Sequence, residues 1–149
     1  MFNKLLIAID DSDLSRKALA TGLDMAVKHG AQVIVLTVTE PVATGIGSGG
    51  FGTIDPASIL AGIEKAYAEH AKQILAEANL MARDRGLDIL TLHVPRRRPA
   101  VGIIDTAQSH DCDCIVMGSH GRRGVGRLLL GSQATEVLSR ATIPVLIVK

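Results

Sequence analysis

The sequence predicts an α/β fold in which helices cover both faces of a parallel β-sheet. Five short apolar runs occur along the chain, and they lack the alternation with polar residues that marks a half-exposed strand. Helical patterns fill the gaps between these runs, which is the βαβ order of a three-layer α/β/α sandwich. The expected strands are Leu5–Ile9, Val33–Val38, Ile89–Val94, Cys114–Met117 and Val145–Val148.

The first expected helix has a signal at each end. Ser12 is suited to be its N-cap, and the helical pattern continues to about His29, where Gly30 takes the position after the last turn. The inner face is expected to carry Leu14, Ala18, Gly22, Met25 and Ala26.

The second expected helix is the longest. Asp55 and Pro56 fit its N-cap and first position, and the pattern runs to about Arg85, with Gly86 as the stop. Residues at helical spacing mark the face that is expected to turn inward: Ile59, Ile63, Tyr67, His70, Ile74, Ala78 and Met81. We expect His70 to be a packed or half-exposed histidine rather than a ligand.

Two shorter helices complete the pattern. One is expected over about Ala100–Ser109, with Val101, Ile104 and Ala107 inward, and the other over about Gln133–Arg140, with Ser132 as its N-cap.

Two connecting segments have unusual compositions. The stretch 42–53 holds five glycines (Gly45, Gly47, Gly49, Gly50 and Gly52), so it is either a functional loop or a plain connector. The turn Arg96–Arg98 lies between two prolines, and its arginines either contact a phosphate or partner, or are simply solvated.

Composition excludes several classes of function. The chain has 149 residues, a formal net charge of +1 and 47% hydrophobic residues, which fits a single domain over residues 1–149 and gives no case for binding nucleic acid. Only Phe2, Phe51 and Tyr67 are aromatic, so a base-stacking surface is not expected. No apolar run is long enough for membrane insertion, and no signal peptide is recognised, so we expect a soluble cytoplasmic protein.

The sulfur chemistry is limited. Cys112 and Cys114 are too few for a disulfide framework. Together with His110 they form a His-x-Cys-x-Cys run, but no second ligand pair accompanies it, and Cys114 is expected to be a small core residue rather than a metal ligand.

A glycine-rich loop dominates the C-terminal third. Gly118, two residues, Gly121, nine residues and then Gly131-Ser132 join an apolar strand to the start of a helix. Backbone N–H groups at such a turn, together with the helix dipole, favour an anion such as phosphate. Arg122, Arg123 and Arg127 add positive charge on the same loop. The spacing is not that of a Walker A loop, because no Gly-Lys-Ser/Thr occurs.

The G-x-x-G-x9-G-S spacing resembles the ATP-binding signature of the universal stress protein family, and the similarity extends over essentially the whole chain. The opening residues 4–12, the segment 113–118 and the final segment 142–148 are similar to that family's first, fourth and last strands. The resemblance implies a five-stranded parallel sheet of order 3-2-1-4-5, which is Rossmann-like and adenine nucleotide alpha hydrolase-like. Ligands of open α/β sheets bind where the strand order reverses, here between the first and fourth strands.

By this resemblance, the ligand is ATP, with AMP or another adenine nucleotide as alternatives, accompanied by Mg. Asp10 is implied near the ribose and phosphates and as the direct or indirect metal ligand. The remaining implied binding residues enclose the adenine (Ala8, Ile9, Val38), form the floor (Met117, Gly118) or hold the triphosphate (Gly121, Arg122, Arg123, Gly131, Ser132, Gln133). One departure is the turn Val94–Pro99, which lacks the glycine common in the family.

The resemblance also implies a homodimer paired through Val145–Val148. The leading functional hypothesis is an ATP-binding regulatory protein of the stress response. A slow ATPase or nucleotide transferase is an alternative, although no catalytic residue is assigned and His120 is the only candidate base in the loop. A third hypothesis is an adaptor for a transporter or another partner, with an empty cleft.

Overall fold

A computed structural model describes residues 2–43, 55–121 and 130–149. In chain order the elements are β1 (Lys4–Ala8), α1 (Asp13–His29), β2 (Gln32–Val38), α2 (Pro56–Arg83), β3 (Ile89–Val94), α3 (Pro99–Ser109), β4 (Cys114–Gly118), α4 (Ser132–Arg140) and β5 (Val145–Val148). The five strands are parallel and lie in the order β3-β2-β1-β4-β5, so the predicted fold class and strand order are confirmed.

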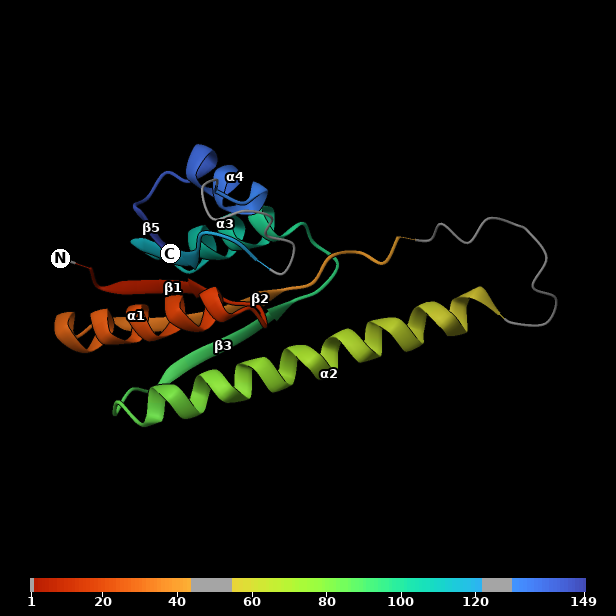
Figure 1. Ribbon diagram of the computed structural model, residues 1–149, viewed down its shortest axis with the longest axis horizontal. Coiled ribbons are helices and arrows are strands. Elements are labelled where there is room, and N and C mark those ends of the chain that lie inside the picture. The colour runs from red at the N-terminus through yellow and green to blue at the C-terminus, as the bar shows by residue number, and fades with distance from the viewer. Residues whose placement is uncertain (1, 44–54, 122–129) are drawn as a thin grey trace.

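The sheet lies between two helical layers (Figure 1). Leu5 and Ile7 of β1 face α1 and α2, whereas Leu6 and Ala8 face α3 and α4, because successive side chains of a strand point to opposite faces. The central strand therefore contributes to both cores, which explains why its sequence is apolar without alternation. Among the described residues, no helix has the length and apolar character needed to cross a bilayer.

The helix starts follow the predicted signals in two of three cases. The Ser12 hydroxyl accepts from the Ser15 N–H at the start of α1, and Asp55 accepts from the Ala57 N–H at the start of α2. In α4 the prediction was wrong, because Gly131 is the N-cap and Ser132 is the first helical residue. The Ser132 side chain therefore does not cap its helix.

Some predicted bounds and faces also need correction. Helix α2 ends at Arg83 rather than Arg85, and Gly86, the expected stop, has a positive φ of 70°. On α1, Leu14 and Met25 are only partly buried, and the buried face also includes Ser15, Leu19 and Leu23. On α3, Val101 is partly buried, whereas Ile103 is buried.

Helix α2 extends beyond the sheet that it covers (Figure 1). Its 28 residues span about 42 Å, whereas the six residues of β3 span about 20 Å. The first buried residue of α2 is Ala71, and Tyr67 is 41% exposed. On the face marked by helical spacing, Ile59 and Ile63 are only partly buried, because the N-terminal half of the helix lies beyond the strands (Figure 1).

Each arginine of the turn before α3 lies beside a carboxylate. Arg96 is 3.8 Å from Glu64, Arg97 is 3.2 Å from Asp105, and Arg98 is 2.7 Å from Glu136. These exposed pairs connect the turn to α2, α3 and α4. The turn is built without the family's glycine, and Arg96 takes a positive φ of 55° within it.

Candidate functional site

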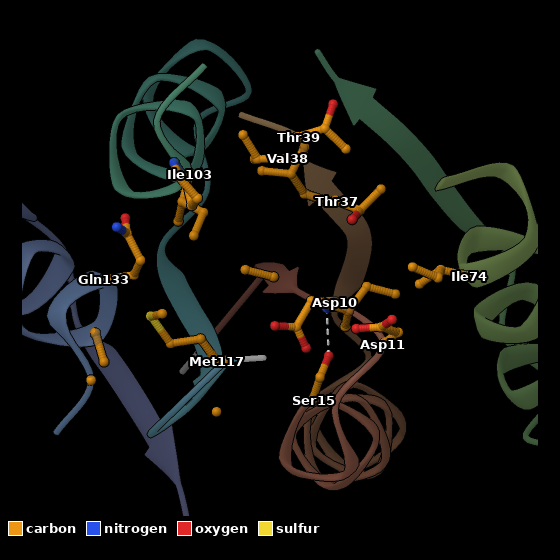
Figure 2. A pocket seen from close by; sticks show the side chains of 18 of the residues that line it. Asp10, Asp11, Ser15, Thr37, Val38, Thr39, Ile74, Ile103, Met117 and Gln133 are labelled. Carbon is orange, nitrogen blue, oxygen red and sulfur yellow. Dashed lines mark hydrogen bonds between the residues drawn. The ribbon is translucent and has the colours of Figure 1, made fainter. Parts of the chain in front are cut away.

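A cavity of about 620 Å³ opens at the carboxyl ends of β1, β2 and β4. Figure 2 shows side chains from both helical layers around it, with Ile74 of α2 on one side and Ile103 of α3 on the other. Its position is the point where the strand order reverses, since β1 lies between β2 and β4. Open α/β sheets generally bind ligands at this place.

Ten of the twelve residues that the sequence implied for ligand binding line this cavity. They are Ala8, Ile9, Asp10, Val38, Met117, Gly118, Gly121, Gly131, Ser132 and Gln133. Arg122 and Arg123 lie outside the described residues, as do Arg127 and the glycine-rich stretch Gly45–Gly52. Contact of the ten with a nucleotide stays a prediction.

Asp10 is oriented by the first turn of α1. Its backbone N–H donates to the Ser15 hydroxyl at 2.7 Å, and its Oδ1 accepts from the Ser12 N–H at 2.9 Å and from the Ser12 hydroxyl. The side chain thereby closes a local turn onto the backbone two residues later. The carboxylate is held at the cavity wall, as Figure 2 shows.

Gly121 approaches this carboxylate closely. A Cβ built on Gly121 would lie 2.7 Å from Oδ2 of Asp10, so a side chain here would require the carboxylate or the turn to shift. The φ of Gly121 is not among the positive values, so closeness to Asp10, and not an unusual backbone, favours glycine here. The carboxylate after β1 and the glycine turn after β4 thus lie at the same edge of the sheet.

At the start of α4, one of the backbone N–H groups that we expected to face an anion is not available. The N–H of Gly131 donates to the Ser119 carbonyl at 2.8 Å, so this amide is already used within the protein. The N–H groups of Ser132, Gln133 and Ala134 have no carbonyl four residues earlier within the helix. These three amides, with the helix dipole, make the cavity end of α4 suited to an anion.

Gln133 contributes to the site through its side chain as well. Its Oε1 accepts from the N–H of Ala100 at 2.9 Å, and Ala100 lies in the first turn of α3. Helix α3 has no side-chain cap of its own at Arg98. Gln133 thus joins the N-terminal ends of α3 and α4 at the cavity.

Sequence reasoning missed several lining residues. Thr37 and Thr39 lie at the carboxyl end of β2, so the rule that ligands bind at the carboxyl edge of a sheet could have identified them. Ile74 and Ile103 belong to helices, and the sequence does not show where a helix lies over the sheet. His70 also lines the cavity, and its Nε2 lies 3.1 Å from Oδ2 of Asp11. The half-exposed state expected for His70 is what the structure has.

Among the residues that the structure describes, three titratable groups have pKa values shifted from their ordinary values. Burial lowers the pKa of the His93 imidazole, whose Nε2 lies 2.9 Å from the Thr39 hydroxyl. Burial raises the pKa of the Cys112 and Cys114 thiols, so both are protonated at neutral pH. Cys114 is 1% exposed, as expected for a core residue. Within the described ranges, no group of three His, Cys, Asp or Glu side chains is arranged to hold a metal ion.

Comparison with known proteins gives a consistent result. The model of the universal stress protein family matches residues 1–149. A Thermus aquaticus protein named "Universal stress protein in QAH/OAS sulfhydrylase 3'region" is 35% identical over 149 residues, with 100% of both chains covered. The universal stress protein YxiE of Bacillus subtilis is 33% identical over 150 residues, again with 100% of both covered.

A solved structure is also similar over its full length. The universal stress protein from Archaeoglobus fulgidus, determined in complex with dAMP, is 25% identical with a TM-score of 0.66, and the alignment covers 100% of this chain and 98% of that one.

Proposed function

Because the chain belongs to the universal stress protein family, we propose that it binds ATP in the cavity at the carboxyl ends of β1 and β4. Nucleotide occupancy would then regulate its association with a protein partner in the cytoplasm. The complex of the Archaeoglobus fulgidus relative with dAMP supports an adenine nucleotide as the ligand class.

The closeness of Asp10 to the Gly121 turn carries this proposal. ATP requires an apolar surface for the base and a polar, amide-rich surface for the phosphates. The cavity offers Ala8, Ile9 and Val38 for the first and the N-terminal amides of α4 for the second. Its volume of about 620 Å³ lies within the range of small-molecule sites.

Mg would bind with the phosphates, and Asp10 is the residue that we propose to hold it. Its carboxylate lies at the cavity wall, where Oδ1 accepts from the Ser12 N–H and Oδ2 lies 2.7 Å from the position of a Cβ on Gly121. A carboxylate is the ligand that Mg²⁺ usually takes from a protein beside substrate phosphates. When bound, the ion would offset phosphate charge near Asp10, which otherwise repels the ligand.

The test is direct identification of the ligand. Freshly purified protein is denatured, and the released small molecules are identified by mass spectrometry. Calorimetry then measures binding of ATP, AMP and cyclic AMP to the stripped protein. Co-purified adenine nucleotide and saturable ATP binding are the expected results. No released nucleotide together with no calorimetric signal would contradict the proposal and favour an adaptor with an empty cleft.

We also propose a homodimer through the β5 edge. Ile115 donates its N–H to Pro144 and Ser119 donates to Val148, so alternate residues of β5 bond to β4. The backbone groups of Val145 and Ile147 consequently face the sheet edge, where an apolar strand is prone to pair with another chain. Sedimentation velocity at micromolar concentration should give a dimer for the wild type and a monomer for Ile147→Pro. A monomeric wild type would contradict this assembly.

A further inference from the structure

The side chains of Ser119 and His120 form a pair at the end of β4. Ser119 is 2% exposed, and its backbone is fixed on both sides. Its N–H donates to the Val148 carbonyl, and its carbonyl accepts from the Gly131 N–H, both at 2.8 Å. The Ser119 hydroxyl lies 2.9 Å from Nδ1 of His120. The imidazole is therefore attached to a rigid part of the cavity wall.

This contact determines which ring nitrogen carries the proton. A buried hydroxyl must donate its hydrogen to some acceptor, and among the described residues the only side-chain partner of Ser119 is Nδ1. Nδ1 then accepts, and neutral His120 carries its hydrogen on Nε2. The tautomer is thus assigned from the hydrogen-bond network.

Nε2 is left without a partner. It is buried, and no acceptor for it exists among residues 2–43, 55–121 and 130–149. A buried donor without an acceptor is destabilising, so a water, an ion or a ligand that accepts from it would stabilise the protein.

The ring lies against the start of α4. A Cβ on Gly131 would lie 3.4 Å from Cα of His120 and 3.9 Å from Cδ2, the ring atom bonded to Nε2. Both residues line the cavity. The imidazole ring and the N-terminal end of α4 therefore lie at the same end of the cavity.

We propose that Nε2–H of His120 donates to a phosphate oxygen of the bound nucleotide, with Ser119 as the positioning residue that keeps the hydrogen on Nε2. This inference rests on the proposed function, because it requires a phosphate-bearing ligand in the cavity. The family resemblance had not placed His120 among the binding residues. In this proposal, His120 makes the site bind nucleotides more tightly than nucleosides.

The same tautomer argues against His120 as a general base. Nε2 holds a hydrogen, and the lone pair of Nδ1 accepts from Ser119. No nitrogen of the neutral ring then has a lone pair with which to take a proton from an attacking water. The imidazole is a donor to the ligand in this arrangement.

Two substitutions of His120 test the roles of its two ring nitrogens separately. In His120→Gln, the amide nitrogen can occupy the position of Nε2, so the ligand donor is kept. In His120→Asn, the shorter side chain reaches only the position of Nδ1, so the acceptor for Ser119 is kept and the ligand donor is lost. Titration calorimetry would compare ATP and adenosine on each variant, with thermal unfolding as the check on folding.

We expect His120→Asn to weaken ATP binding roughly ten- to hundredfold, as for loss of a hydrogen bond to a charged group, and to leave adenosine binding within about threefold. His120→Gln should stay within about threefold of the wild type for both ligands. Equal ATP affinity in wild type and His120→Asn would overturn the inference alone. Equal weakening of ATP and adenosine would also overturn it, because the contact would not be with phosphate. A wild type that binds neither ligand would instead overturn the proposed function, and this inference with it.

A spectroscopic measurement does not depend on the variants folding. In ¹⁵N spectra of the histidine side chains, Nε2 of His120 should be the protonated nitrogen and Nδ1 the unprotonated one. ATP should shift the Nε2 signal more than adenosine does. A signal showing hydrogen on Nδ1, or an unchanged Nε2 signal on saturation with ATP, would contradict the assignment.

Discussion

The position that a Cβ on Gly121 would take lies 2.7 Å from Oδ2 of Asp10. Gly121→Ala therefore forces the carboxylate or the turn to move. Because Ser12 holds the other carboxylate oxygen, we expect the turn to give way and ATP affinity to fall roughly tenfold or more. The loss should come with little change in unfolding temperature, since Gly121 is exposed. Calorimetry and thermal unfolding measure the two effects.

The double variant Asp10→Ala, Gly121→Ala provides the control. If the methyl group acts through the carboxylate, adding Gly121→Ala to Asp10→Ala should change affinity far less than it does in the wild type. Additive losses would show that the alanine disturbs the turn by another route.

Asp10→Asn tests the metal role of the carboxylate. The amide oxygen can still accept from Ser12, so the local turn should be kept. Without Mg, removal of a negative charge should leave ATP affinity equal or higher. With Mg, the wild type should gain roughly five- to tenfold, or about 1–1.4 kcal/mol, and the variant should gain little. Titrations in Mg and in excess chelator make the comparison, and an equal Mg effect in both proteins would exclude Asp10 as the ligand.

Two glycines within helices should respond oppositely to the same substitution. A Cβ on Gly22 would lie 2.6 Å from Cδ1 of Ile7, which is 0% exposed and cannot easily move, so Gly22→Ala should cost about 1–3 kcal/mol. Gly62 in exposed α2 has nothing within 4 Å of its Cβ position, so Gly62→Ala should stabilise by about 0.5–1 kcal/mol. Urea unfolding measures both, and a stabilised Gly22→Ala would contradict the close packing of α1 on β1.

The parts of the fold that sequence could predict are those that local patterns determine. Apolar runs without alternation predicted both ends of every strand to within one residue of the structure. They did so because strands that are covered on both faces leave no polar position inside them. The rule that ligands bind at the carboxyl edge brought Asp10, Val38 and Gly118 to one cavity.

What sequence could not predict depends on contacts between elements. Periodicity gave the inner face of α2, but it could not tell that the helix leaves the sheet before Ala71. Likewise, two hydrogen bonds form only once α3, α4 and β4 are packed together. In one the Gly131 N–H donates to the Ser119 carbonyl, and in the other the Ala100 N–H donates to Gln133.

His93 should make stability depend on pH. Burial lowers its pKa below the ordinary value of 6.5, so the folded protein binds a proton less readily than the unfolded chain. The contribution of neutral His93 to the free energy of unfolding is therefore complete above pH 6.5. It is lost as the pH falls through the lower pKa of the folded state. Between about pH 7.5 and about pH 5.5, the free energy of unfolding should fall more in the wild type than in His93→Gln, which keeps a partner for Thr39. Parallel losses in urea titrations would exclude His93 as the cause.

Gln133 should stabilise α3 although it belongs to α4. Pro99 has no N–H and Arg98 provides no side-chain cap, so the Ala100 N–H in the first turn of α3 bonds to Oε1 of Gln133. Gln133→Ala should therefore lower the free energy of unfolding by about 1 kcal/mol. Gln133→Glu keeps an acceptor oxygen and adds negative charge at a helix N-terminus, so it should be at least as stable as the wild type. The same glutamate places charge beside the expected phosphates, so its ATP affinity should fall while its stability does not. Urea unfolding and calorimetry on both variants test this separation, and equal destabilisation by Ala and Glu would show that packing rather than the cap gives Gln133 its effect.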